Sequence, residues 1–147
     1  MKCPYCRSAT TDVFNSRPTK FGSQIWRRRR CLSCHESFTT YEAIDLSFME
    51  VIKHSRRREG YSRAKLYASI YGAFLDVSDK QGVIDAITDT VEAKLLDGHT
   101  SPIASTTIAE IVLQTLKHFN TAAFVRYLTH RTDLASEAQL RKELKKY

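Results

Sequence analysis

The sequence has no apolar run long enough to cross a membrane, and no targeting signal precedes its first cysteine. We therefore expect no membrane partner. Glycine is scarce, with five in 147 residues, and neither Gly-x-x-x-x-Gly-Lys-Ser/Thr nor Gly-x-Gly-x-x-Gly occurs. His-Glu-x-x-His, a nucleophile elbow and a usefully spaced carboxylate pair are also missing. These absences argue against the common enzyme classes, and we expect a protein that is not an enzyme.

Cysteine occurs at only four positions, which form two Cys-x-x-Cys pairs, Cys3 with Cys6 and Cys31 with Cys34. A tight turn within each pair aims both sulfurs at one point, so two turns complete a tetrahedral shell around one Zn²⁺. Two disulfides are disfavoured because no secretion signal is present and only two residues separate the paired cysteines. A redox motif needs one such pair on a larger fold. Four thiolates leave no open coordination position, so the predicted zinc is structural, and reduced cysteines indicate the cytoplasm.

Basic residues outnumber acidic ones, 23 to 16, which gives a net charge of +7 and a pI near 9.4. An anionic partner is therefore expected, with nucleic acid ahead of membrane. The densest basic cluster runs directly into the second cysteine pair, and a strand there places alternate arginines on opposite faces. The residues predicted to contact nucleic acid are Arg17, Arg27, Arg28, Arg29 and Arg30, and Lys20 can add to the same surface.

Length and patterning predict an α+β protein with two domains and a tail. Residues 1–46 are too few to form a strong core unaided, so zinc is expected to supply folding energy to a small β-rich ribbon. Residues 47–135 are long enough for an independent, mainly helical domain with a short β-hairpin, and residues 136–147 form a charged tail. The side chains predicted to form a small apolar cluster beside the metal are Tyr5, Val13, Phe14, Trp26 and Phe38.

The second domain is predicted to open with a strand at residues 48–53 and a polar hairpin that returns at Tyr61. Helices follow, with Ser62 as the N-cap of the first and Gly98 as the stop of the second. Thr107 and Glu110 have the spacing of a capping box for the third helix. The second and fourth helices are expected to begin near Asp79 and Thr121.

Basic side chains gather around this hairpin and the start of the first helix. Lys53, His54, Arg57, Arg58 and Lys65 can surround a polyphosphate, because a strand, a hairpin and a helix N-terminus bring them together. From the residues alone, an exposed basic hairpin is the competing interpretation.

Both halves resemble known families. The first half resembles the NrdR family of bacterial transcriptional repressors, which regulate ribonucleotide reductase genes. The segments that carry this resemblance are Met1-x-Cys-Pro-x-Cys, Asn15-Ser16-Arg17, Arg27-Arg28-Arg29-x-Cys-x-x-Cys and Phe38-Thr39-Thr40-Tyr41-Glu42. The second half is similar to an ATP-cone, an adenine-nucleotide sensor, through the segments Val51-x-Lys53 and Arg58-Glu59-x-Tyr61-x-x-x-Lys65-Leu66.

The resemblance implies a zinc ribbon that binds operator repeats in double-stranded DNA, and a cone that binds ATP or dATP and sets the state of a homo-oligomer. It also implies a cytoplasmic, nucleoid-associated location. The residues that it places around the nucleotide are Val51, Lys53, His54, Glu59, Ser62, Lys65, Leu66 and Ser105. In this arrangement the lysines neutralise phosphates, Glu59 accepts a hydrogen bond from the adenine amino group, and Val51 and Leu66 pack against the base.

The chain departs from the usual family pattern at several positions. Trp26 stands where an arginine is usual, Arg30 where glutamate or glutamine is common, and His54 where another basic residue is common. The segment that ends at Arg131 also differs from its family counterpart.

Two other functions are considered beside a nucleotide-sensing repressor. One is a zinc-ribbon nucleic-acid-binding module with a helical protein-interaction domain, and retention of ATP or dATP by the purified protein separates it from the repressor. The other is a regulatory fragment of a reductase. Two observations argue against it, since the chain has no room for a catalytic barrel and no cysteine to spare for a radical site.

Overall fold

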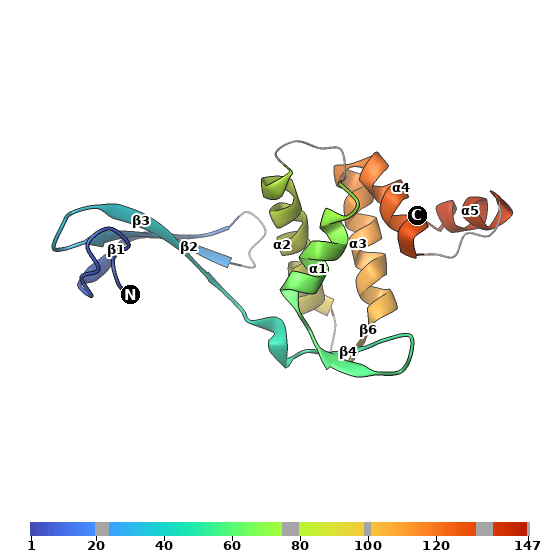
Figure 1. Cartoon of the computed structure of the whole chain (residues 1–147), viewed down its shortest axis with the longest axis horizontal. Coiled ribbons are helices and arrows are strands. Elements are labelled where there is room, and N and C mark those ends of the chain that lie inside the picture. Colours follow the sequence, from blue (N-terminus) through green and yellow to red (C-terminus); the bar gives the residue numbers. More distant parts are fainter. Residues whose placement is uncertain (20–23, 75–79, 99–100, 132–136, 147) are drawn as a thin grey trace. The chain divides into compact units, whose positions relative to one another are not determined.

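The computed structural model describes residues 1–19, 24–74, 80–98, 101–131 and 137–146. The chain divides into two compact units, Met1–Asp45 and Leu46–Tyr147. Each unit has its own three-stranded sheet, and the helices belong to the second unit (Figure 1). The predicted α+β class is confirmed.

The first unit is an antiparallel sheet of β1 (Thr11–Pro18), β2 (Gln24–Cys31) and β3 (Ser37–Ala43), with β2 in the centre. The register between β1 and β2 shifts between Val13 and Asn15, where β1 carries one extra residue. The predicted arginine strand is therefore β2, and it is paired on both edges. In the described part of this unit the buried side chains are Cys3, Cys31 and Phe38. So small a core leaves much of the unit's stability to a bound metal.

The second unit begins with the short helix η1 (Leu46–Phe48) and a small sheet of β5 (Arg58–Gly60), β4 (Glu50–Ile52) and β6 (Ile103–Ala104). Strand β4 pairs antiparallel with β5 and parallel with β6. The predicted hairpin is thus present, but its first strand is shorter than the predicted residues 48–53, because Phe48 belongs to η1. Because β6 pairs with β4, residues about 50 positions apart in the sequence meet beside the hairpin.

The helices are α1 (Arg63–Tyr71), α2 (Gln81–Gly98), α3 (Ser105–Phe119), α4 (Thr121–Arg131) and α5 (Glu137–Leu144). As predicted, Ser62 caps α1, since its hydroxyl accepts the Lys65 N–H at 3.4 Å. The predicted start of the second helix at Asp79 lies outside the described residues, and Gly98 is the last residue of α2. The largest fully buried side chains of the helical core are Phe74, Ile70, Ile84, Ile87, Leu95, Leu116 and Leu128. Within the described residues, no helix has both the length and the apolar character needed to cross a membrane.

The capping box predicted at Thr107 and Glu110 is wrong. Helix α3 begins two residues earlier, at Ser105, and its N-cap Ala104 makes no side-chain capping bond. The parallel pairing of Ile103 and Ala104 with β4 fixes the backbone up to that point. Tertiary pairing therefore decided where this helix begins, and the local capping signal did not.

Candidate functional site

The two cysteine pairs lie on turns with matching backbone geometry. The Arg7 N–H donates to the Cys3 carbonyl oxygen at 2.9 Å, and the His35 N–H donates to the Cys31 carbonyl oxygen at 3.0 Å. Arg7 and His35 each follow the second cysteine of a pair, and both have a φ of 62°, in the left-handed region. The backbone therefore turns back sharply after each pair, in the same way at both positions.

These turns bring all four sulfurs together. The Sγ atoms of Cys3, Cys6, Cys31 and Cys34 lie within 4.8 Å of one another, with Cys3 and Cys34 separated by 3.7 Å and Cys6 and Cys31 by 3.5 Å. Four sulfurs at about 2.3 Å from a tetrahedral zinc ion lie about 3.8 Å apart. The four cysteines are positioned to bind one zinc ion, and the predicted metal centre is confirmed.

The pKa values of the Cys31 and Cys34 thiols are shifted in opposite directions. A backbone hydrogen bond at Cys34 favours the Cys31 thiolate and lowers its pKa to about 6. At Cys34 a backbone hydrogen bond at Glu36 also favours the thiolate, but burial and hydrogen bonds to the three neighbouring sulfurs raise the pKa to about 12. Burial and the neighbouring sulfurs thus oppose a thiolate at Cys34, and a divalent metal such as Zn²⁺ supplies the positive charge that favours it.

The predicted apolar cluster beside the metal is only partly correct. Phe38 is buried with Cys3 and Cys31. Tyr5 and Phe14, however, expose 62% and 56% of their surface. Tyr5 lies in the turn of the first cysteine pair, and Phe14 is the extra residue of the β1 irregularity. Neither contributes to the small core.

All five arginines predicted to contact nucleic acid lie on adjacent strands, Arg17 on β1 and Arg27 to Arg30 on β2. Residues that oppose each other in these ladders share a face of the sheet. The register places Arg17 opposite Trp26, which puts Arg17 on the same face as Arg28 and Arg30. The structure therefore divides the five arginines between two faces. Lys20 lies outside the described residues.

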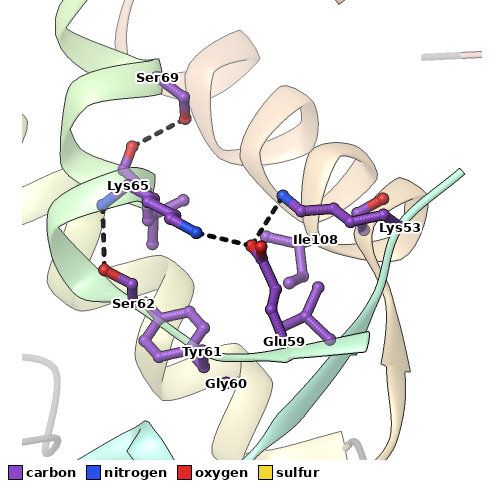
Figure 2. Close-up of a pocket in the computed structure, with 11 residues that line it drawn as sticks. Lys53, Glu59, Gly60, Tyr61, Ser62, Lys65, Ser69 and Ile108 are labelled. Carbon is purple, nitrogen blue, oxygen red and sulfur yellow. Dashed lines mark hydrogen bonds and ion pairs between the residues drawn. The ribbon is translucent and has the colours of Figure 1, made fainter. Parts of the chain in front are cut away.

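A pocket of about 100 Å³ lies between the hairpin, α1 and α3 of the second unit (Figure 2). Seven of the eight residues predicted to surround a nucleotide line it, and they are Val51, Lys53, Glu59, Ser62, Lys65, Leu66 and Ser105. His54 does not line the pocket, because it is exposed in the turn of the hairpin.

Four lining residues were not predicted from the sequence, namely Gly60, Tyr61, Ser69 and Ile108. A helical-spacing argument finds two of them. Ser69 is one turn beyond Lys65 on α1, and Ile108 is one turn beyond Ser105 on α3. Gly60 and Tyr61 directly follow Glu59 on the hairpin, but the sequence alone does not show which side of that hairpin faces α1.

The centre of the pocket is a carboxylate held by three cations. Glu59 Oε1 lies 3.1 Å from Lys53 Nζ and 3.0 Å from Lys65 Nζ, and Glu59 Oε2 lies 2.9 Å from Arg57 Nη2. Lys53 and Lys65 reach this carboxylate from different elements, as Figure 2 shows. Hydrogen bonds from Lys65, Arg57 and Lys53 lower the Glu59 pKa to about 2, so the carboxylate is ionised at physiological pH.

A second polar cluster holds the wall of the pocket in place. The Tyr61 hydroxyl donates to Glu92 Oε1 on α2 at 2.9 Å. Arg63 at the start of α1 pairs with the same carboxylate and with Asp89 Oδ1, the latter at 2.7 Å. Burial, together with the nearby Glu92 charge, raises the pKa of Tyr61, so its phenol stays protonated and keeps donating. The pocket is thereby tied to α2.

Replacing Glu59 with glutamine should increase the affinity of the pocket for inorganic triphosphate by about tenfold. The neutral amide is the size of the carboxylate but no longer neutralises Lys53 and Lys65, which become available to phosphate oxygens. Titration calorimetry with sodium triphosphate measures the change. Glu50→Gln is the matched control. Glu50 forms an ion pair with Arg58 at 2.9 Å, and neither residue lines the pocket. Unchanged affinity in Glu59→Gln would show that Glu59 does not compete with phosphate for the two lysines.

Comparison with known proteins assigns both units. Residues 1–42 match the family described as transcriptional repressor NrdR-like, N-terminal domain, and residues 49–134 match the ATP cone domain. The transcriptional repressor NrdR of Nitrosomonas europaea is 39% identical over 127 residues, which cover 86% of this chain and 80% of that protein. The transcriptional repressor NrdR of Thermomicrobium roseum is 37% identical over 144 residues, which cover 98% of this chain and 89% of that protein.

A Cys₄ zinc ribbon joined to an ATP-cone defines a class of regulator whose metal is structural and whose second unit is suited to a nucleotide. The chain belongs to the NrdR family of transcriptional repressors. The predicted resemblance is confirmed, and the family is one of regulators and not of enzymes. A transcriptional repressor of this family acts on DNA.

Proposed function

We propose that this chain represses ribonucleotide reductase genes by binding repeated operator sequences through its zinc ribbon, with ATP or dATP in the second unit controlling oligomeric state and DNA affinity. One observation carries the nucleotide part of the proposal. Lys53 and Lys65 converge on one carboxylate oxygen in a pocket that also offers apolar contact from Val51 and Leu66. Association with operators places the protein at the nucleoid.

In the proposed complex the two lysines bind the phosphate chain. Val51 and Leu66 pack against the base, and Glu59 accepts a hydrogen bond from the adenine amino group. Ser62 and Ser105 contribute hydroxyls near the first turns of α1 and α3, where backbone N–H groups favour anions. A volume of about 100 Å³ is below the roughly 300 Å³ typical of small-molecule sites. Nucleotide binding therefore requires the two lysines to exchange Glu59 for phosphate.

The proposed switch is a change of oligomeric state caused by nucleotide binding, and it requires the nucleotide to bind one assembly more tightly than another. A ligand shifts an equilibrium between assemblies only if it binds one of them more tightly. Only Ile44 and Asp45 separate β3 from η1, so contacts between second units restrict the spacing of the attached ribbons. Repeated DNA sites bind most tightly to the assembly whose spacing lets two ribbons bind at the same time. This avidity effect needs no new contact.

We expect dATP to stabilise a DNA-competent oligomer and ATP alone to stabilise a larger, more weakly binding one. The mass of the zinc-loaded full chain and its affinity for DNA from upstream of reductase genes are to be measured without nucleotide, with ATP and with dATP. Guanosine triphosphate is the matched control, since it has the same ribose and triphosphate but an oxygen in place of the adenine 6-amino group.

Equal mass and equal DNA affinity in all samples would overturn the switch. With DNA binding retained and no nucleotide bound, that result would favour the zinc-ribbon module whose helical unit serves protein interaction. Equal responses to guanosine and adenosine triphosphates would leave phosphate recognition intact and contradict the proposed role of Glu59.

A further inference from the structure

The register of the ribbon sheet sorts its arginines into two chemically different faces. Opposing residues in an antiparallel pair point to the same side, and neighbours along a strand point to opposite sides. The open face comprises Arg17, Trp26, Arg28, Arg30, Thr39 and Tyr41. The cysteine-side face comprises Arg27, Arg29, Cys31, Phe38, Thr40 and Glu42.

Arginines of the cysteine-side face are engaged by the sheet itself. Arg27 Nη2 forms an ion pair with Glu42 Oε2 at 2.7 Å. Arg29 Nε donates to Thr40 Oγ1 at 3.1 Å, and Arg29 lies opposite Phe38, the aromatic residue of the ribbon core. On this face Glu42 neutralises the charge of Arg27, and Arg29 lies opposite the core residue Phe38.

Arginines of the open face are supported by aromatic rings. The Arg17 guanidinium carbon lies 5.0 Å from the centre of the Trp26 ring, and that of Arg30 lies 5.7 Å from the Phe14 ring. Such stacking orders a guanidinium and leaves its N–H edges available for acceptors. Arg28 lies between these two arginines in the sequence, and its Nη1 donates a hydrogen bond to Thr39 Oγ1 at 3.0 Å. The carboxylate on this face, Asp12, accepts the Val13 N–H at 2.8 Å.

We propose that the open face is the surface that contacts duplex DNA, and that Trp26 is a positioning residue that holds Arg17 ready for that contact. Arg27 and Arg29 instead maintain the sheet. This inference rests on the proposed function as a DNA-binding repressor and says which part of the ribbon performs it.

The chemistry of the face fits a duplex better than a single strand. Supported guanidinium edges match phosphate oxygens and the paired acceptors of guanine in the major groove. Single-strand binding relies on aromatic rings that stack with unpaired bases. On this face a guanidinium already lies over the Trp26 ring and another over the Phe14 ring.

The test uses the zinc-loaded full chain and a duplex that it selects from a random-sequence library. Arg17→Ala, Arg28→Ala and Arg30→Ala should each weaken binding roughly fivefold or more if they read a base, or lower the slope of log affinity against log salt by about 0.9 if they contact a phosphate. Arg27→Ala and Arg29→Ala are the matched controls. They remove the same charge from the same strand, and with zinc content unchanged they should alter affinity by less than about twofold.

A double-mutant cycle tests the role given to Trp26. If the ring acts through Arg17, Trp26→Leu should weaken binding as much as Arg17→Ala, and the double variant should be no weaker than either. Trp26→Phe should retain most of the affinity, because phenylalanine still offers a ring face.

Four outcomes would overturn the inference. Losses in Arg27→Ala or Arg29→Ala that equal those of the open-face variants would show that the faces do not differ. Additive losses in the cycle would show that Trp26 does not act through Arg17. Tighter binding of a single strand of the same sequence would assign the face to unpaired bases. If no duplex is selected at all, the proposed repressor function fails together with the inference, whereas the other outcomes leave it standing.

Discussion

Replacing Cys31 with serine should remove the zinc, unfold the first unit and abolish DNA binding. Among the described residues of this unit, the buried core comprises Cys3, Cys31 and Phe38, which cannot offset the conformational entropy of some 45 residues. Structural zinc in small domains contributes roughly 10–16 kcal/mol of apparent binding free energy at neutral pH, as much as the whole stability of a typical domain. The second unit should stay folded, because it has its own core around Phe74 and Leu116.

Elemental analysis, circular dichroism and DNA binding together measure this effect. The zinc content should fall from one ion per chain to almost none, and the helical signal should persist. Ser33→Ala is the matched control, since it changes a residue of the same turn and leaves the four sulfurs in place. One zinc ion per chain with full DNA binding in Cys31→Ser would show that the fourth sulfur is dispensable.

Removing either pocket lysine should weaken ATP and dATP binding by roughly 10- to 100-fold, the range for a lost hydrogen bond to a charged group. Lys53 and Lys65 approach the same Glu59 oxygen, so both are within reach of one phosphate chain. In Lys53→Ala and Lys65→Ala the effects of nucleotide on oligomer mass and DNA affinity should be reduced to a similar extent. The zinc content should not change, since the metal lies in the other unit.

Arg57→Ala tests whether nucleotide affinity depends on direct contact with the two lysines or only on the net charge of the hairpin. Arg57 also pairs with Glu59, but its side chain is 73% exposed and it does not line the pocket. Its removal should change nucleotide affinity by less than about threefold, as expected for an exposed ion pair. A loss in Arg57→Ala as large as that in Lys53→Ala would mean that affinity follows the net charge of the hairpin and not the two convergent lysines.

The metal centre was predictable because its information is local. A pair of cysteines two residues apart can bring both sulfurs together within one turn, and only the meeting of Cys3 and Cys6 with Cys31 and Cys34 needed the sheet. The Ser62 cap was predictable for the same reason, since its partner is the Lys65 N–H three residues away. Local signals failed at Thr107, where pairing between β6 and β4 set the start of α3.

The sequence by itself determined the zinc ligands, the α+β class, the basic strand and most of the lysine-containing hairpin, because each depends on residues close together in the chain. Tertiary structure alone decided that Lys53 and Lys65 share Glu59 and that Ile108 completes the pocket, because these residues come from separate elements. It also decided the division of the arginines. The extra residue between Val13 and Asn15 sets the ladder that places Arg17 over Trp26, and a one-residue slip would carry Arg17 to the other face.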